Sequence, residues 1–121
     1  KTLDNLFKNI ECDHLTIKLD VENFEFEALK GTINLIKKYQ PVIILEILQR
    51  EIKAGFSPAY KFLKDLGYTF FNPEKKYIGR SKLFKLLPGN SEIIIRLVNK
   101  SLNGYNLYTH LLCLPNIKND L

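Results

Sequence analysis

Three acidic residues and one lysine stand where two predicted strands end. Lys18, Asp20 and Glu22 alternate along the first strand, which would place them about 6.6–6.8 Å apart on one face. Glu46 comes toward the end of the next apolar run. Ionised groups inside a sheet need partners or solvent, and the carboxyl ends of parallel strands provide solvent and are where ligands bind. The four side chains therefore form a candidate site at one edge of a sheet.

Carboxylates in such a place can do chemistry or can simply be paired. A carboxylate can accept the proton of a hydroxyl group as a general base. Two carboxylates also suit a glycosidase, although the sequence does not give their separation. An ion pair between Lys18 and Asp20, with Glu46 capping a loop, explains the same residues. The spacing therefore indicates a site without naming its reaction.

The hydrophobic pattern predicts alternating strands and helices that would position these residues. The predicted elements are a short helix over Thr2–Phe7, a strand over Leu15–Glu22, a helix of about four turns between Phe24 and Pro41, a strand over Val42–Leu48, a helix from Ser57 to Gly67 and a strand over Tyr68–Phe71 that turns at Asn72–Pro73. Short connections in this order are typical of an open α/β sheet with mostly parallel strands and flanking helices.

The last third of the chain fits more than one pattern. Ile93–Val98 could be a β-branched strand, yet Ser91-Glu92 resembles a helix start and the apolar spacing is helical, so we predict a helix that ends at Asn103-Gly104. Leu107–Leu114 alternates and is predicted to be a closing strand. The residues after Pro115 are predicted to be a frayed tail.

Composition and charge limit the classes of protein. The 121 residues are 45% hydrophobic and 26% charged, which suits one globular domain or a piece of one. The net charge of +5 is dispersed, so we expect no nucleic-acid partner. No apolar run could span a bilayer and no signal segment opens the chain, which predicts a cytoplasmic protein without a membrane span. The chain starts at Lys1 and contains no Met, so we expect a missing N-terminal region.

Several residue types that often carry chemistry lack the necessary spacing. His14 and His110 are isolated and are predicted to lie on the surface or at loop ends. Cys12 and Cys113 have no neighbours at metal-ligand spacing, so we predict no metal site. The glycines form no phosphate-binding loop, and a glycine-rich turn that held a cofactor would therefore lie upstream.

Four segments together resemble the FkbM-type methyltransferases. They are KTLDNLF, HLTIKLDVENFEFEALKG, KKYQPVIILEI and FLKDLGY, which cover Lys1 to about Tyr68. The family has a Lys-Ile-Asp-Val-Glu-Gly pattern at the end of its fourth strand, and Lys18, Asp20 and Glu22 match it. Glu46 matches the Glu that ends the fifth strand. Asn23 departs from the pattern because it replaces the usual Gly, at a turn where Asn tolerates positive φ better than most residues.

The resemblance implies the C-terminal half of a Rossmann-like class I methyltransferase sheet. Residues 1–121 would be a partial domain from strand four onward, without the N-terminal half that holds most of the cofactor, S-adenosylmethionine. It implies catalytic roles for Lys18, Asp20, Glu22 and Glu46, with Asp20 and Glu22 also near the cofactor. The expected acceptor is a hydroxyl oxygen of a sugar, lipid or other small molecule. A non-catalytic α/β interaction module derived from this fold is the alternative, and a homo-oligomer is left open.

Overall fold

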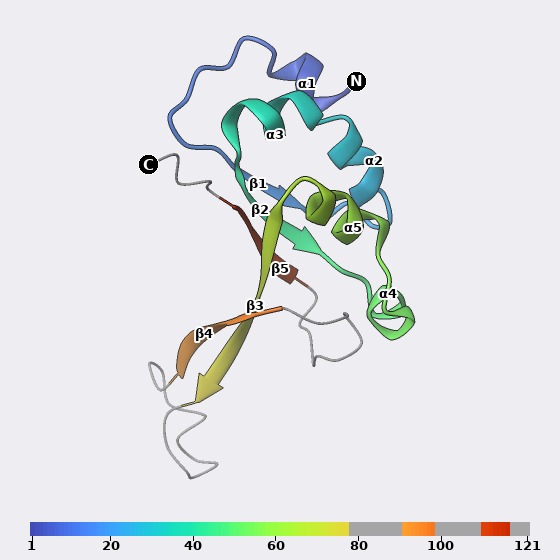
Figure 1. The fold of residues 1–121 in the computed structure, drawn as a ribbon, viewed down its shortest axis with the longest axis vertical. Helices are drawn as coiled ribbons and strands as arrows, with labels where there is room; N and C mark the ends of the chain where they lie inside the picture. Colours follow the sequence, from blue (N-terminus) through green and yellow to red (C-terminus); the bar gives the residue numbers. More distant parts are fainter. Residues whose placement is uncertain (78–90, 99–109, 117–121) are drawn as a thin grey trace.

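The sheet is built from strands that lie far apart in the sequence. A computed structural model describes residues 1–77, 91–98 and 110–116, with only the backbone given for 74–77 and 91–96. In this part of the chain the strands are β1 (Thr16–Leu19), β2 (Val42–Glu46), β3 (Tyr68–Tyr77), β4 (Ser91–Leu97) and β5 (His110–Pro115). The helices are α1 (Leu3–Leu6), α2 (Glu25–Lys30), α3 (Ile33–Tyr39), α4 (Gln49–Ala54) and α5 (Pro58–Asp65). The strands form one sheet in the order β1-β2-β5-β3-β4 (Figure 1).

The sheet is mixed, which corrects one expectation. β1 and β2 pair in parallel, with Leu19 opposite Leu45, as the sequence predicts. β5 is antiparallel to both β2 and β3, and β4 is antiparallel to β3. The α/β class is confirmed, but the prediction of mostly parallel pairing is wrong, because β5 inserts between β2 and β3 in the reverse direction. β1, β2 and β3 still run the same way, so the carboxyl ends of β1 and β2 meet at one edge.

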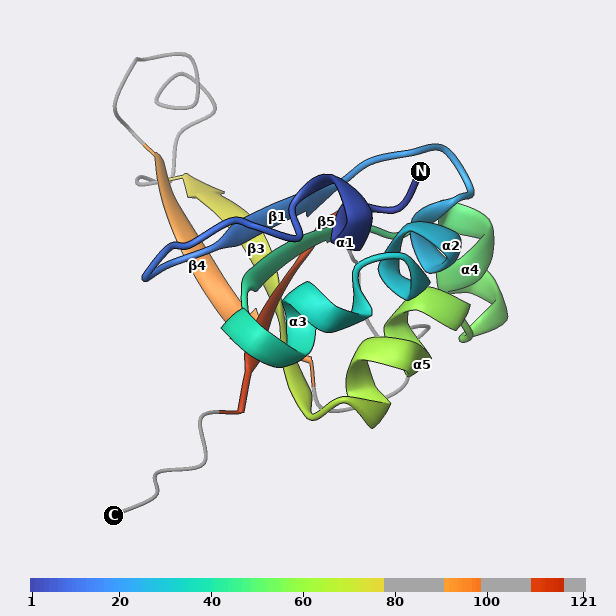
Figure 2. The same ribbon diagram turned by 90° about the horizontal axis from the view of Figure 1, so that it is seen from above.

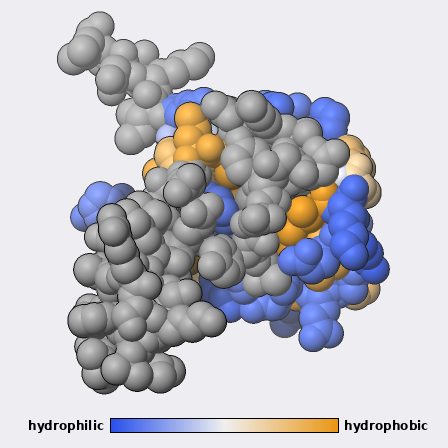
Figure 3. Space-filling model, turned by 90° about the horizontal axis from the view of Figure 1, so that it is seen from below, coloured by the Kyte–Doolittle hydropathy of each residue, from blue (hydrophilic) through white to orange (hydrophobic). Residues whose placement is uncertain are grey.

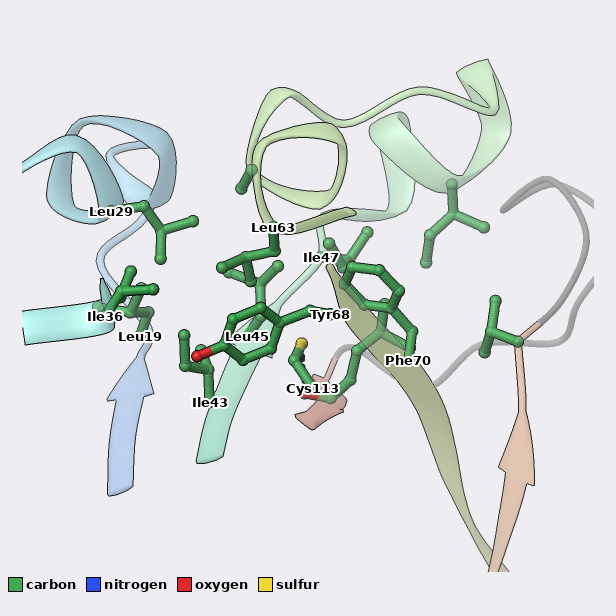
Figure 4. Packing of buried hydrophobic residues seen from close by; sticks show 14 residues of the cluster. Leu19, Leu29, Ile36, Ile43, Leu45, Ile47, Leu63, Tyr68, Phe70 and Cys113 are labelled. Atoms are coloured by element: carbon green, nitrogen blue, oxygen red, sulfur yellow. Dashed lines mark hydrogen bonds between the residues drawn. The ribbon is translucent and has the colours of Figure 1, made fainter. Parts of the chain in front are cut away.

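Buried side chains fill the space between the sheet and the helices. Figures 2 and 4 show the helices gathered over one face of the sheet, with the core side chains pointing between the two layers. Leu45, Leu63 and Leu111 come from β2, α5 and β5 and are each 0% exposed. Cys113 lies in the same cluster, and burial raises the pKa of its thiol. Buried side chains of β1, β5 and α5 therefore hold β2 in place.

A break at Gly31-Thr32 divides the predicted four-turn helix into α2 and α3. The Asp4 carboxylate accepts hydrogen bonds from the backbone N–H groups of Asn34 and Leu35, each at 3.0 Å. These bonds replace the bonds that a continuous helix would make, and they cap the N-terminus of α3. A Cβ atom at Gly31 would lie 3.2 Å from Thr2, so glycine allows α1 to pack closely here.

The helices around β2 match the prediction in part. α1 begins after Thr2, whose hydroxyl accepts from the Asn5 N–H, and α5 begins after Ser57, whose hydroxyl accepts from the Tyr60 N–H. Thr2 and Ser57 therefore cap the N-termini of the two helices, near the predicted starts. α4 is a helix of six residues that the sequence pattern did not predict, and the Glu51 carboxylate closes its N-terminus by accepting the Leu48 N–H.

Two predictions for the later strands are wrong. β3 continues through Asn72–Pro73 where a turn is predicted, because it pairs with β4 as far as Tyr77. β4 occupies Ser91–Leu97 where a helix is predicted, since its backbone pairs with β3 and its β-branched isoleucines favour a strand. The closing strand is confirmed for His110–Leu114. The predictions for Leu107–Thr109, for the helix end at Asn103-Gly104 and for the tail beyond residue 116 lie outside the described residues.

The described surface mixes polar and apolar areas. Figure 3 shows hydrophobic patches beside hydrophilic ones on one face of the molecule. The large exposed hydrophobic side chains are Leu6, Phe7, Val21, Phe24, Phe56 and Leu97. None of the helices in the described ranges is long and apolar enough to cross a membrane.

Candidate functional site

Asp20 and Glu46 lie side by side at the carboxyl edge of the two parallel strands. Leu19 pairs with Leu45 in the parallel register, so the residues that follow each of them are neighbours. Asp20 comes directly after β1, and Glu46 is the last residue of β2. The charges of the two carboxyl groups interact, because the Asp20 carboxylate raises the pKa of Glu46. The structure therefore brings together the two acids that the sequence predicts at this edge.

Lys18 holds Asp20 in its ionised form. The Lys18 Nζ atom lies 2.8 Å from Asp20 Oδ2, and both side chains are about half exposed. The hydrogen bond and the positive charge of Lys18 lower the pKa of Asp20. An exposed pair of this kind contributes little to stability. Its main effect is to keep a negative charge fixed beside Glu46.

Glu46 has the opposite electrostatic environment. Partial burial raises the pKa of the Glu46 carboxyl, and the neighbouring Asp20 carboxylate raises it further. A like charge nearby disfavours the ionised form of a carboxyl group, so Glu46 keeps its proton to a higher pH than Asp20 does. A carboxyl group with a raised pKa is better matched to accepting a proton near neutral pH.

His110 completes the cluster and was missed in the sequence analysis. It begins β5 and lies opposite Glu46 in the antiparallel register. Its Nε2 atom is 3.7 Å from Asp20 Oδ2. His110 is therefore not isolated as predicted, although its place at the start of a strand and its one-third exposed side chain agree with the expected position. The signal that could have found it is its place at the start of the closing strand, but the sequence does not show that this strand lies beside β2.

Glu22 does not join the cluster. β1 ends at Leu19, so the predicted alternation stops there and Val21 is 41% exposed instead of buried with Leu19. Glu22 and Asn23 have φ values of 45° and 84°, which turns the chain away from the sheet edge. Glu22 is exposed on this loop. The positive φ expected at Asn23 is confirmed, and its side-chain oxygen accepts a hydrogen bond from Arg50.

No group of three or more His, Cys, Asp or Glu side chains within the described ranges is arranged to hold a metal ion. Asp20, Glu46 and His110 are instead engaged with one another and with Lys18. The arrangement can bind the hydroxyl or amino groups of a ligand and can accept a proton from it.

Asp20→Asn should lower the pKa of Glu46 toward its ordinary value. The substitution keeps the size of the side chain but removes the negative charge that favours the protonated form of Glu46. The burial of Glu46 is unchanged, so its pKa should stay somewhat above that of a free glutamate. A pH titration that follows the glutamate side-chain carboxyl carbons by NMR measures this change.

Asp65→Asn is a matched control for this titration. Asp65 forms an exposed ion pair with Lys61 on α5, and its charge is not among those that shift the pKa of Glu46. The control should leave the Glu46 titration where it is. An equal titration of Glu46 in the parent protein and in Asp20→Asn would show that the two carboxyl groups do not interact.

Comparison with known protein families gives one match. The model of the methyltransferase FkbM domain matches residues 1–70. This region contains Lys18, Asp20, Glu22 and Glu46, and His110 lies beyond it. No curated protein and no solved structure matches the chain. Because the matched region is more than half of the 121 residues, the chain belongs to the FkbM methyltransferase family.

Proposed function

We propose that the protein transfers a methyl group from S-adenosylmethionine to a hydroxyl oxygen of a sugar, lipid or other small acceptor, at the carboxyl edge of β1 and β2. Family membership supports methyl transfer in general and implies a methyl donor. The observation that carries the proposal is the parallel register of β1 and β2, which places Asp20 beside Glu46 at this edge. Ligands of open α/β sheets bind at the carboxyl ends of the strands.

Glu46 is the proposed proton acceptor. Methyl transfer depends on alignment of the acceptor oxygen with the methyl carbon, and removal of the hydroxyl proton makes that oxygen a better nucleophile. The raised pKa of Glu46 suits this role better than the lowered pKa of Asp20. Asp20 stays ionised through Lys18 and orients Glu46 and the acceptor. His110 lies close enough to Asp20 to contribute to the same network.

The described residues fit only part of the cofactor. Asp20 and Glu22 offer exposed carboxylates that can accept hydrogen bonds from the amino or ribose hydroxyl groups of S-adenosylmethionine. When bound, the cofactor supplies an electrophilic methyl group on a sulfonium. A site for the rest of the cofactor requires further strands. We therefore propose that residues 1–121 are the C-terminal half of a class I methyltransferase domain, and that an upstream half completes the Rossmann-like sheet.

A calorimetric titration of the full-length protein with S-adenosylhomocysteine tests the proposal. Asp20→Ala should weaken binding about 10–100-fold, because hydrogen bonds to a charged group are lost. Asp65→Ala is the control and should bind as the parent protein does, since Asp65 lies on α5 in an exposed ion pair. Failure of the full-length parent protein to bind would favour a non-catalytic α/β interaction module. Unchanged affinity in Asp20→Ala would remove Asp20 from the cofactor site.

A further inference from the structure

A cavity of about 470 Å³ lies just beyond the carboxyl edge of β1 and β2, between α2, α4 and α5. Its volume is within the range of about 300–1,000 Å³ that is usual for small-molecule sites. Asn23 and Leu48 contribute to its wall, and they follow Asp20 and Glu46 by three and two residues. The loops that follow β1 and β2 therefore contribute to the cavity wall.

Glu25 connects the cavity to the candidate site. It lines the cavity, is only 6% exposed, and is one of the charges that raise the pKa of Glu46. Its Oε1 atom accepts a hydrogen bond of 3.1 Å from the Val21 N–H in the loop after β1. A ligand bound in the cavity beside Glu25 would consequently be within electrostatic reach of Glu46.

Two phenylalanines give the cavity apolar walls. Phe26 is fixed by an edge-to-face contact with Phe62, with ring centroids 5.7 Å apart, and by the Lys30 ammonium 4.6 Å from its ring centroid. Phe56 also lines the cavity and is 56% exposed. An exposed aromatic ring in a cavity wall loses water contact when the flat face of a ligand ring covers it.

The polar groups that line the cavity include both hydrogen-bond acceptors and a donor. Glu51 uses Oε2 to accept the Leu48 N–H, and Glu25 uses Oε1, so the second oxygen of each carboxylate can accept from a ligand. Arg50, which donates to the Asn23 side chain, supplies further donors. The carboxylates outnumber the guanidinium group, which disfavours an anionic ligand.

Neutral hydroxyl groups match this pattern better than a cation does. Lys30 lies over the ring of Phe26 and its Nζ atom is 3.6 Å from Glu27 Oε1. Phe26 and Glu27 therefore already have a cationic partner from the protein itself. A polyhydroxylated ring carries donors for the carboxylates, acceptors for Arg50 and an apolar face for Phe56. We infer that this cavity is the acceptor site and that it binds a neutral sugar ring of a glycan. The inference rests on the proposed methyl-transfer function and names its acceptor class.

Three probes with the same ring and different charge test the inference in the full-length protein. They are methyl α-D-glucopyranoside, the corresponding 2-amino-2-deoxy glycoside and the corresponding glucuronide, and binding is followed by shifts of backbone amide resonances in NMR titrations. The neutral probe should shift the resonances of Phe56 and Ala59, and the glucuronide should bind about tenfold more weakly. Phe56→Ala should weaken the neutral probe about tenfold as well.

Phe24→Ala is the matched control, because Phe24 is 66% exposed but does not line this cavity. It should leave the affinity for the neutral probe unchanged. No shift at the cavity with any probe, or tighter binding of either charged probe than of the neutral one, would overturn the inference. Cofactor binding is measured separately, in the calorimetric titration with S-adenosylhomocysteine. Glycoside binding without cofactor binding would contradict only the proposed methyl transfer. Cofactor binding without glycoside binding would contradict only the proposed acceptor site.

Discussion

Glu46→Gln should lower kcat about 10²–10⁴-fold in the full-length protein, the usual contribution of a positioned general base. Glutamine has nearly the same shape as glutamic acid but cannot accept the hydroxyl proton. Its binding contacts are largely kept, so KM should change much less than kcat. The measurement is the initial rate of methyl transfer from S-adenosylmethionine to an acceptor that the parent protein methylates.

The same substitution should stabilise the fold at pH values above the ordinary pKa of a glutamate. The folded-state pKa of Glu46 is raised, so the folded state holds its proton to a higher pH than the unfolded chain does. The stability of the parent protein should consequently fall as the pH rises from the unfolded pKa through the folded pKa. Glu46→Gln removes this loss, and denaturant titrations at several pH values should show its advantage growing across that window.

Glu11→Gln is the control for both measurements, since Glu11 is exposed and lies outside the candidate site. It should change neither the rate nor the pH dependence of stability beyond small surface effects. A Glu46→Gln protein with almost the parent rate would exclude Glu46 as the base. Reduced activity together with increased stability would instead identify a carboxylate kept for function at a cost to folding.

Local sequence patterns were enough to predict the edge where the candidate site lies. The alternation in Leu15–Leu19 and the apolar run Val42–Glu46 each specify a strand, and their parallel pairing places Asp20 beside Glu46. Ser57-Pro58 gives the start of α5 in the same local way. These features depend on neighbouring residues, which a single sequence displays directly.

Contacts between distant residues account for what the sequence did not predict. The break between α2 and α3 depends on Asp4, which is 30 and 31 residues from the two N–H groups that it binds. His110 reaches Asp20 only because β5 inserts between β2 and β3. β4 is a strand because β3 pairs with it, although its own spacing also fits a helix. Periodicity within one segment carries no information about such partners.

Leu45→Ala should lower the free energy of unfolding by about 2–5 kcal/mol, which is the usual effect of truncating a fully buried leucine. Leu45 is 0% exposed, and it lies between Leu19 of β1 and Leu111 of β5 in the sheet register. Its loss leaves a cavity beneath the helices at the residue that precedes Glu46, so it removes support from the candidate site as well as from the core. Denaturant unfolding should show a lower midpoint with an unchanged slope.

Leu6→Ala separates this effect from the general loss of a leucine side chain. Leu6 is 56% exposed in α1, so its truncation removes little buried area and should cost less than about 1 kcal/mol. Equal losses in the two variants would mean that β2 is not held by the packing described above. A loss confined to Leu45→Ala would show that the packing of the core holds the strand that ends at Glu46.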